Sequence, residues 1–139
     1  MKHIRTVGVV GAGTMGAALA QKFVQEGFDV ILADRTINYV EKGLNHIHLT
    51  LQDGIEKKIF TKQQVETYLS HLKGTDSIPD LKNCDLVVEA IFENLDAKKD
   101  LFRSLSEIVS GDCIVATNTS SFSVTELAEN MVHPERFIG

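Results

Sequence analysis

The chain has 139 residues, of which 43% are hydrophobic and 24% are charged, and it contains only two prolines. This composition predicts one compact domain and excludes a disordered or fibrous protein. The net charge of -5 argues against nucleic acid as a partner, as does the absence of any Lys or Arg run longer than two residues. No apolar stretch approaches the roughly 20 residues of a membrane span, so we expect no membrane association and no targeting segment.

The first part of the chain predicts a strand, a helix and a second strand. Val7 to Val10 is a short apolar run closed by glycines, as expected of a parallel strand buried on both faces. From Thr14 to Glu26 apolar residues recur at helical spacing, and Gly27 stands where a left-handed C-cap belongs. Val30 to Ala33 is a second β-rich run, which ends at Asp34. Together these residues predict one strand–helix–strand unit.

A helical pair is expected after the second strand. Apolar residues spaced by three and four predict one long amphipathic helix from Ile37 to Phe60. The sequence Thr61-Lys62-Gln63-Gln64 has the form of a capping box and begins a shorter helix through about Leu72. A turn-rich segment follows, and it includes a short edge strand at Lys73 to Thr75.

Strands and helices alternate in the second half of the chain. Apolar residues from Leu95 to Val109 predict a helix that Gly111 ends, and the capping box Ser123-Val124-Thr125-Glu126 opens another helix through about Met131. Apolar runs predict strands at Leu86 to Val88, at Ile114 to Ala116 and from Phe137-Ile138 onward. This alternation predicts a mostly parallel sheet that is covered on both faces.

A glycine-rich turn joins the first strand to the first helix. Gly11-Ala12-Gly13-Thr14-Met15-Gly16 fits the G-x-G-x-x-G pattern, and Asp34 follows about 20 residues later at the end of the next strand. Gly11 permits the tight turn, Gly13 lets the backbone approach a pyrophosphate, and Gly16 lets helix and strand pack closely. We therefore expect an α/β fold of the Rossmann type, doubly wound, with a helical pair inserted after the second strand.

The carboxylate of Asp34 predicts NAD as the cofactor. It would accept hydrogen bonds from both hydroxyls of the adenosine ribose, and its charge would repel a 2′-phosphate. Arg35 could pair with such a phosphate, which leaves NADP open; alternatively it stacks on the adenine or is solvated. FAD enzymes share the fingerprint and are a further alternative.

Cysteines and histidines show no metal-binding pattern. Cys84 and Cys113 lie beside or within apolar runs without CxxC spacing, which predicts two reduced, buried thiols in the cytoplasm or, if a targeting segment has been removed, the mitochondrial matrix. His133 precedes Pro134 in a turn. The remaining histidines are expected to face solvent; they are His3, His46, His48 and His71.

Three motifs in order carry a family resemblance: the glycine turn, Val87-Val88-Glu89-Ala90-Ile91-Phe92-Glu93-Asn94, and Thr117-Asn118-Thr119-Ser120-Ser121. With these motifs the chain resembles the amino-terminal, NAD-binding domain of the L-3-hydroxyacyl-CoA dehydrogenases over essentially its whole length. The resemblance implies hydride transfer between an L-3-hydroxyacyl-CoA and NAD, which gives a 3-oxoacyl-CoA. It also implies a separate helical domain that completes the acyl-CoA site and forms most contacts of a homodimer.

The same resemblance assigns roles to particular residues. Glu93 and Lys98 would lie near the ribose and nicotinamide side of the cofactor, Asn118 would hold the catalytic imidazole or the nicotinamide, and Ser120 would hydrogen-bond the 3-oxygen of the substrate. Thr50 and Lys57 match positions near the CoA moiety. Without the resemblance, Glu93 and Lys98 would be an exposed pair at a helix start, and Ser120 a helix-entry turn. All expected cofactor contacts are Gly11, Gly13, Thr14, Met15, Gly16, Asp34, Arg35, Ala90, Ile91, Glu93, Lys98 and Asn118.

The family's general base is a histidine paired with a glutamate, and both are expected beyond Gly139. We therefore expect the 139-residue chain to bind NAD and to have negligible turnover. The resemblance implies a parent that is a 3-hydroxyacyl-CoA or 3-hydroxybutyryl-CoA dehydrogenase of β-oxidation or butyrate-type metabolism, alone or fused to an enoyl-CoA hydratase. A dehydrogenase of a sugar acid and a stand-alone NAD-binding regulatory module without chemistry remain as alternatives.

Overall fold

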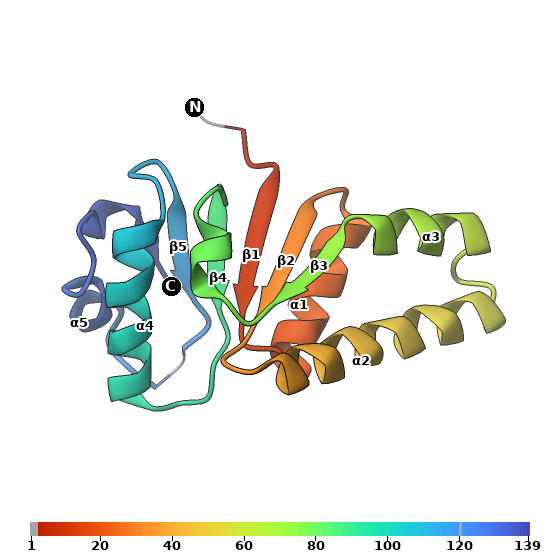
Figure 1. Ribbon diagram of the computed structural model, residues 1–139, viewed down its shortest axis with the longest axis horizontal. Coiled ribbons are helices and arrows are strands. Elements are labelled where there is room, and N and C mark those ends of the chain that lie inside the picture. Colours follow the sequence, from red (N-terminus) through yellow and green to blue (C-terminus); the bar gives the residue numbers. More distant parts are fainter. Residues whose placement is uncertain (1–2, 120) are drawn as a thin grey trace.

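A six-stranded parallel sheet forms the centre of the computed structural model, which describes residues 3–119 and 121–139 (Figure 1). The strand order is β3-β2-β1-β4-β5-β6, and every pairing among the described strands is parallel. This order confirms the predicted doubly wound sheet, whose two halves meet between β1 and β4. The strands are β1 (Thr6–Val10), β2 (Asp29–Ala33), β3 (Leu72–Thr75), β4 (Leu86–Glu89), β5 (Ile114–Thr117) and β6 (Phe137–Ile138).

Helices connect the strands and cover the sheet. They are α1 (Thr14–Gln25), α2 (Ile37–Glu56), α3 (Lys62–Ser70), α4 (Leu95–Ile108) and α5 (Val124–Ala128), with short 3₁₀ helices η1 (Ile78–Leu81) and η2 (Pro134–Arg136). The carboxyl ends of the strands point to the bottom of Figure 1, where the loops into α1, α2 and α4 begin. The α2–α3 pair extends away from the sheet, in the place where the sequence predicts an inserted helical pair.

The long helix α2 ends at Glu56, four residues before the predicted end at Phe60. The chain reverses there, since Lys58 adopts a positive φ of 61° and the Ile59 N–H donates to the carbonyl of Gly54 at 2.8 Å. The reversal brings the Phe60 ring back over α2, where it packs edge-to-face against Tyr68 with ring centroids 5.7 Å apart. The predicted end was wrong because Ile59 and Phe60 continue the apolar spacing beyond the helix, where Ile59 is exposed and Phe60 serves the contact between α2 and α3.

The other predicted boundaries differ by a few residues. The capping box at Thr61 is present, but α3 ends at Ser70 because Leu72 is the first residue of the edge strand β3. The last helix, α5, ends at Ala128 rather than near Met131. Beyond α5 the Met131 N–H donates to the Ala128 carbonyl at 3.0 Å, and this turn directs the buried Met131 side chain into the core.

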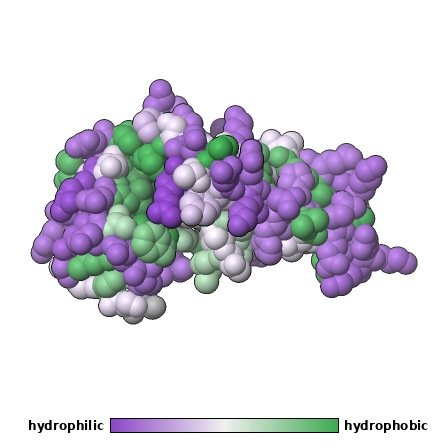
Figure 2. Space-filling model, turned by 60° about the horizontal axis from the view of Figure 1, so that its bottom comes forward, coloured by the Kyte–Doolittle hydropathy of each residue, from purple (hydrophilic) through white to green (hydrophobic). Residues whose placement is uncertain are grey.

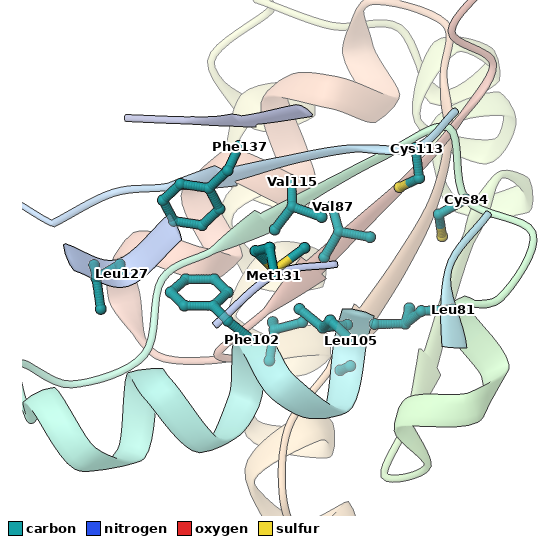
Figure 3. Packing of buried hydrophobic residues seen from close by; sticks show 12 residues of the cluster. Leu81, Cys84, Val87, Phe102, Leu105, Cys113, Val115, Leu127, Met131 and Phe137 are labelled. Carbon is teal, nitrogen blue, oxygen red and sulfur yellow. The ribbon is translucent and has the colours of Figure 1, made fainter. Parts of the chain in front are cut away.

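Two apolar clusters pack on opposite faces of the sheet. Val9 belongs to the cluster under α1 and α2, whereas its neighbour Val10 belongs to the cluster under α4 and α5, because successive strand residues point to opposite faces. In the second cluster Phe102 and Phe137 pack edge-to-face with ring centroids 4.8 Å apart (Figure 3). Burial in both clusters anchors the strand ends that carry the loops of the site.

Both cysteines are buried thiols outside any disulfide, as predicted, and they lie near each other at one end of the second cluster (Figure 3). Burial raises the pKa of the Cys84 thiol to about 12. Within the described residues, no helix combines the length and apolar character needed to cross a bilayer. The same residues contain no group of three or more His, Cys, Asp or Glu side chains placed to hold a metal ion.

Candidate cofactor-binding site

The glycine turn between β1 and α1 is built almost entirely of main chain. Gly11 has a φ of +110°, and a Cβ there would lie 2.4 Å from the carbonyl oxygen of Ala90. A Cβ on Gly16 would lie 1.6 Å from the carbonyl oxygen of Gly11. At Gly13, by contrast, a Cβ would meet nothing within 4 Å. Gly11 and Gly16 thus allow the turn to close, while Gly13 leaves open space above it.

Asp34 follows β2 and is held against this turn. Its Oδ2 accepts a hydrogen bond from the Ala12 N–H at 2.8 Å, and its Oδ1 accepts one from the Arg35 N–H at 2.7 Å. A carboxylate has about four lone-pair sites, so each oxygen can accept a further hydrogen bond. The side chain is therefore oriented at the carboxyl edge of β2 with capacity for a ligand's hydroxyl groups.

Arg35 lies between two aromatic rings at the same edge. Its guanidinium carbon is 5.1 Å from the centroid of Tyr39 and 5.9 Å from that of Phe92, and its Nη2 donates to the Tyr39 hydroxyl at 3.3 Å. The hydrogen bond to Tyr39 raises the pKa of Arg35 above its usual value. Arg35 therefore contacts side chains from both halves of the sheet, since Phe92 follows β4.

A cavity of about 880 Å³ extends across the carboxyl edge of the sheet from Asp34 to the loop after β4. Its size lies within the range of small-molecule sites, roughly 300–1,000 Å³. The predicted cofactor contacts that line it are Gly11, Gly13, Thr14, Met15, Asp34, Arg35, Ala90 and Ile91. Gly16, Glu93, Lys98 and Asn118 are not among its lining residues. The cavity thus joins the glycine turn to the second half of the sheet.

Figure 2 brings this edge forward. Hydrophobic side chains gather on the left, over the half that carries α4 and α5, and hydrophilic ones dominate the right, where the α2–α3 pair lies. Among the apolar side chains that line the cavity, Met15 and Phe92 are 55% and 61% exposed. The wall of the cavity therefore includes apolar side chains that are accessible to a ligand.

The amino end of α1 is suited to an anion. The N-cap residue Gly13 provides no side-chain hydrogen bond, and the first turn of α1 contains no acidic residue. The first N–H groups of a helix lack partners within the helix and carry partial positive charge. Together with the open space above Gly13, this arrangement fits the diphosphate of a dinucleotide.

A buried ion pair lies beyond the other end of the cavity, at the carboxyl end of β4. Lys98 on α4 is only 1% exposed, and its Nζ lies 2.6 Å from Oε2 of Glu89, which is 0% exposed. The same Nζ lies 2.9 Å from Oε1 of Glu93, whose side chain is 42% exposed. The alternative interpretation of Lys98 as an exposed helix-start residue is wrong, because α4 directs its side chain under the loop rather than into solvent.

The segment after β5 is connected to these charges. The Thr117 hydroxyl donates to Oε1 of Glu89 at 2.5 Å, and the Thr119 hydroxyl donates to Oε2 of Glu93 at 2.8 Å. Hydrogen bonds from Lys98 and Thr119 hold the pKa of Glu93 below its usual range. Asn118 is exposed, and its N–H donates to the Glu89 carbonyl at 3.0 Å. Glu93, Lys98 and the segment that carries Asn118 therefore form one connected group.

Sequence reasoning missed Glu89 and Thr117 as individual residues of this group. Glu89 is the last residue of β4 and Thr117 is the last residue of β5, and both strands are apolar and buried. A charged residue in such a position is rarely buried without a partner, so the position of Glu89 at the end of an apolar run was the signal in the sequence. The partner of Glu89 could not be read from the sequence, because Lys98 lies nine residues later on a helix whose orientation depends on tertiary packing.

The remaining predicted residues lie elsewhere or outside the described part. Thr50 and Lys57 stand on or just after α2 and do not line the cavity; Lys57 pairs with Asp53 at 2.9 Å. Ser120 lies outside the described residues. All five histidines are exposed, as expected for four of them, and His46 lines the cavity from α2.

Comparison with known proteins places the chain in a family. Residues 6–139 match the family described as "3-hydroxyacyl-CoA dehydrogenase, NAD binding domain". The chain is 40% identical to a 3-hydroxybutyryl-CoA dehydrogenase of Clostridioides difficile, across 94% of this chain and 47% of that protein. It is 35% identical to a 3-hydroxyadipyl-CoA dehydrogenase of Escherichia coli, across 100% of this chain and 29% of that protein.

A solved structure supports the same placement. The crystal structure of an (S)-3-hydroxybutyryl-CoA dehydrogenase from Ralstonia eutropha superposes with a TM-score of 0.94 at 39% identity, and the match covers 97% of this chain and 48% of that one. The chain thus spans about half the length, or less, of the relatives that it matches.

Proposed function

The chain belongs to the family of NAD-binding domains of 3-hydroxyacyl-CoA dehydrogenases, and we propose that residues 1–139 are the cofactor-binding domain of an enzyme that transfers a hydride between an L-3-hydroxyacyl-CoA and NAD. The observation that carries the proposal is the cavity that runs from Asp34 across the glycine turn to Ala90 and Ile91. Its two ends lie on the two halves of the sheet, as the binding of a dinucleotide requires.

The chain's own groups account for binding of the adenosine diphosphate part. The first N–H groups of α1 would receive the diphosphate, and the free lone pairs of Asp34 would accept the hydroxyls of the adenosine ribose. The negative charge of Asp34 disfavours a 2′-phosphate, so NAD should bind more tightly than NADP. Arg35 is already engaged with Tyr39 and Phe92, which supports a role in stacking rather than phosphate binding.

The second half of the sheet would hold the reacting end. When bound, NAD accepts or donates the hydride through its nicotinamide. Glu93 and Lys98 would position the adjoining ribose, Asn118 the nicotinamide or the catalytic imidazole, and Ser120 the 3-oxygen of the acyl chain. Thr50 and Lys57 would lie along the CoA moiety. The general base would be a histidine outside residues 1–139, and a second, helical domain would complete the acyl-CoA site and the homodimer.

The positions of the histidines support a general base outside residues 1–139. None of the described histidines is buried, and His46, which lines the cavity, does so from α2 on the Asp34 side of the sheet. We therefore expect the 139-residue chain to bind NAD with negligible turnover. The two buried thiols form no disulfide, which supports a reducing compartment, such as the cytoplasm or the mitochondrial matrix.

The test combines NADH binding with oxidation of NADH by acetoacetyl-CoA. Fluorescence titration should show that the 139-residue chain binds NADH, and absorbance at the NADH band should show no turnover. A longer form that includes the expected histidine and the second domain should oxidise NADH. If both forms bind NADH and neither acts on acetoacetyl-CoA, the acyl-CoA assignment fails. Robust turnover by the 139-residue chain would contradict the proposed place of the general base.

A further inference from the structure

Glu89 is a fully buried carboxylate at the junction of the two halves of the sheet. It ends β4, the strand that pairs with β1, and it stands opposite Val10 in that pairing and opposite Thr117 in the pairing with β5. Removing a carboxylate from water is costly unless it is paired and hydrogen-bonded. A buried charge at this position therefore requires an explanation beyond filling the core.

Both oxygens of Glu89 are used, and each partner comes from a different part of the chain. Oε2 accepts from Lys98 Nζ on α4 at 2.6 Å and from the Ile91 N–H in the loop after β4 at 2.7 Å. Oε1 accepts from the Thr117 hydroxyl on β5 at 2.5 Å. One carboxylate thus ties a loop, a helix and a neighbouring strand together at a single point.

The loop that Glu89 holds is a wall of the cofactor cavity. Ala90, Ile91 and Phe92 all line the cavity, and the Ile91 N–H is the group that Glu89 binds. Since that N–H is engaged by Glu89, the loop conformation depends on this carboxylate. Replacing Glu89 would therefore change the shape of the cavity without removing any group that lines it.

The network also reaches from the core to the surface. Lys98, held by Glu89, is the group that binds Glu93 at 2.9 Å, and Glu93 in turn accepts from the Thr119 hydroxyl at 2.8 Å. A well-packed apolar pair in place of Glu89 and Lys98 would often be as stable or more stable. The ion pair is thus better explained by what it orients than by stability alone.

The position of the network in the fold indicates which end of the ligand it serves. In a doubly wound sheet the dinucleotide lies across the crevice, and the half that carries the ribose-binding carboxylate receives the adenosine. Asp34 identifies β1, β2 and β3 as that half. The loop after β4 and the segment after β5 consequently face the nicotinamide half.

We propose that Glu89 is a positioning residue for the nicotinamide half of the cofactor, acting through Lys98, the Ile91 N–H and Thr117. It orients the loop after β4, the ammonium of Lys98 and, through it, the exposed carboxylate of Glu93. Glu89 itself does not contact the cofactor. The inference rests on the NAD binding of the proposed function and adds to it a residue that acts from beneath the site.

Binding of NAD⁺ and of ADP to the 139-residue chain separates this role from a general contribution to folding. ADP contains the adenosine and the diphosphate but neither the second ribose nor the nicotinamide, so it reports on the first half of the sheet. In Glu89→Gln, which keeps the shape of the side chain, the affinity for NAD⁺ should fall about 10-fold or more, since a charged hydrogen-bond partner is lost. The affinity for ADP should stay within about twofold, a change of roughly 0.4 kcal/mol.

Two further variants test the same carboxylate without changing a charge. Thr117→Val removes the hydroxyl that orients Oε1 and should weaken NAD⁺ binding by about 3-fold, or roughly 0.65 kcal/mol, while Thr117→Ser keeps the hydroxyl and should bind NAD⁺ normally. If Glu89→Gln does not fold, the comparison of Thr117→Val with Thr117→Ser tests the inference by itself. Glu26→Gln is the matched control: it changes an exposed glutamate that directly follows α1, and it should bind both ligands as the unaltered chain does.

Each other outcome overturns the inference. Normal NAD⁺ affinity in Glu89→Gln and Thr117→Val would show that the carboxylate orients nothing that the cofactor uses. Equal losses for NAD⁺ and ADP would assign Glu89 to the fold as a whole. If the unaltered chain bound neither ligand, the proposed function would fail and this inference with it, whereas normal binding by the variants leaves the proposed function intact.

Discussion

In the half of the sheet formed by β1, β2 and β3 the turn at the cavity is closed by main-chain groups, whereas in the half formed by β4, β5 and β6 a buried side-chain network holds the loop after β4. In the first half the turn closes because Gly11 and Gly16 have no Cβ. In the second half Glu89 and Lys98 are buried together beneath the loop. The turn therefore requires residues without a Cβ, whereas the network requires that Glu89 and its hydrogen-bonding partners are all present.

The largest expected effect comes from breaking the buried pair. Lys98→Met keeps the unbranched stem but leaves Glu89 without its ammonium partner, which should lower the free energy of unfolding by about 3–5 kcal/mol. Urea denaturation followed by circular dichroism measures this loss. The double variant Glu89→Gln with Lys98→Met should recover most of it, because no buried charge remains unpaired.

The exposed pair Lys22–Glu26 provides the control for this comparison. Its side chains are 70% and 56% exposed, so Lys22→Met should cost less than about 1 kcal/mol. Equal losses of unfolding free energy in Lys22→Met and Lys98→Met would show that the buried pair contributes no more to stability than an exposed pair.

The next effect separates stability from binding within the glycine turn. Gly11→Ala forces a Cβ against the Ala90 carbonyl at a positive φ and should cost about 2–4 kcal/mol of unfolding free energy. Gly13→Ala adds a Cβ that meets no protein atom, so its unfolding free energy should change by less than about 1 kcal/mol. NAD⁺ binding by Gly13→Ala should nevertheless fall about 10-fold, because the methyl group enters the space of the diphosphate.

Calorimetric titration measures NAD⁺ binding, and urea denaturation measures the unfolding free energy of the two variants. Unimpaired NAD⁺ binding by Gly13→Ala would mean that the open space above the turn does not receive the diphosphate. A stable Gly11→Ala chain would show that the turn has another accessible conformation.

A smaller effect is expected at Asp34, on cofactor choice. Asp34→Asn keeps an oxygen that can accept from the Ala12 N–H but removes the charge that opposes a 2′-phosphate. The ratio of NAD⁺ to NADP⁺ affinity should fall about 10-fold, which corresponds to about 1.4 kcal/mol. Equal affinity of the unaltered chain for NAD⁺ and NADP⁺ would contradict the role of Asp34, and the matched exposed variant Asp53→Asn should leave the ratio unchanged.

The smallest effect concerns the pH dependence of stability at Glu93. Lys98 and Thr119 hold its pKa below the ordinary value of 4.5, so the folded state binds the proton less readily than the unfolded chain. This contribution is present above pH 4.5 and is lost as pH falls from there through the folded pKa. Because the side chain is partly exposed, solvent screening keeps the contribution small.

Thermal unfolding between pH 3 and pH 6 measures this contribution, because the range brackets the ordinary pKa of 4.5. The melting temperature of the unaltered chain should fall more steeply below pH 4.5 than that of Glu93→Gln. Parallel curves would show that Glu93 gains nothing from Lys98 in the folded state, and the two halves of the sheet would then differ less than the contacts indicate.

Local patterns in the sequence predict most of the fold correctly. The apolar runs place β1, β2, β4 and β5 to within a residue or two, and the capping box at Thr61 correctly marks the start of α3. The end of α2 was wrong because the apolar spacing continues through Ile59 and Phe60 after the hydrogen-bonded helix has stopped. Apolar spacing predicts a helical face, whereas the end of the helix depends on tertiary contacts such as that of Phe60 with Tyr68.

The sequence by itself determined the glycine turn, the carboxylate after β2 and the family, because each of these depends on short-range spacing. Only the tertiary structure decided that Lys98 is buried, that Glu89 is its partner, and that Thr117 and Thr119 join the same group. The physical reason is that a main-chain turn is specified by neighbouring residues. A buried ion pair is specified by the packing of α4 against the sheet, which brings residues from β4, α4 and β5 to one point.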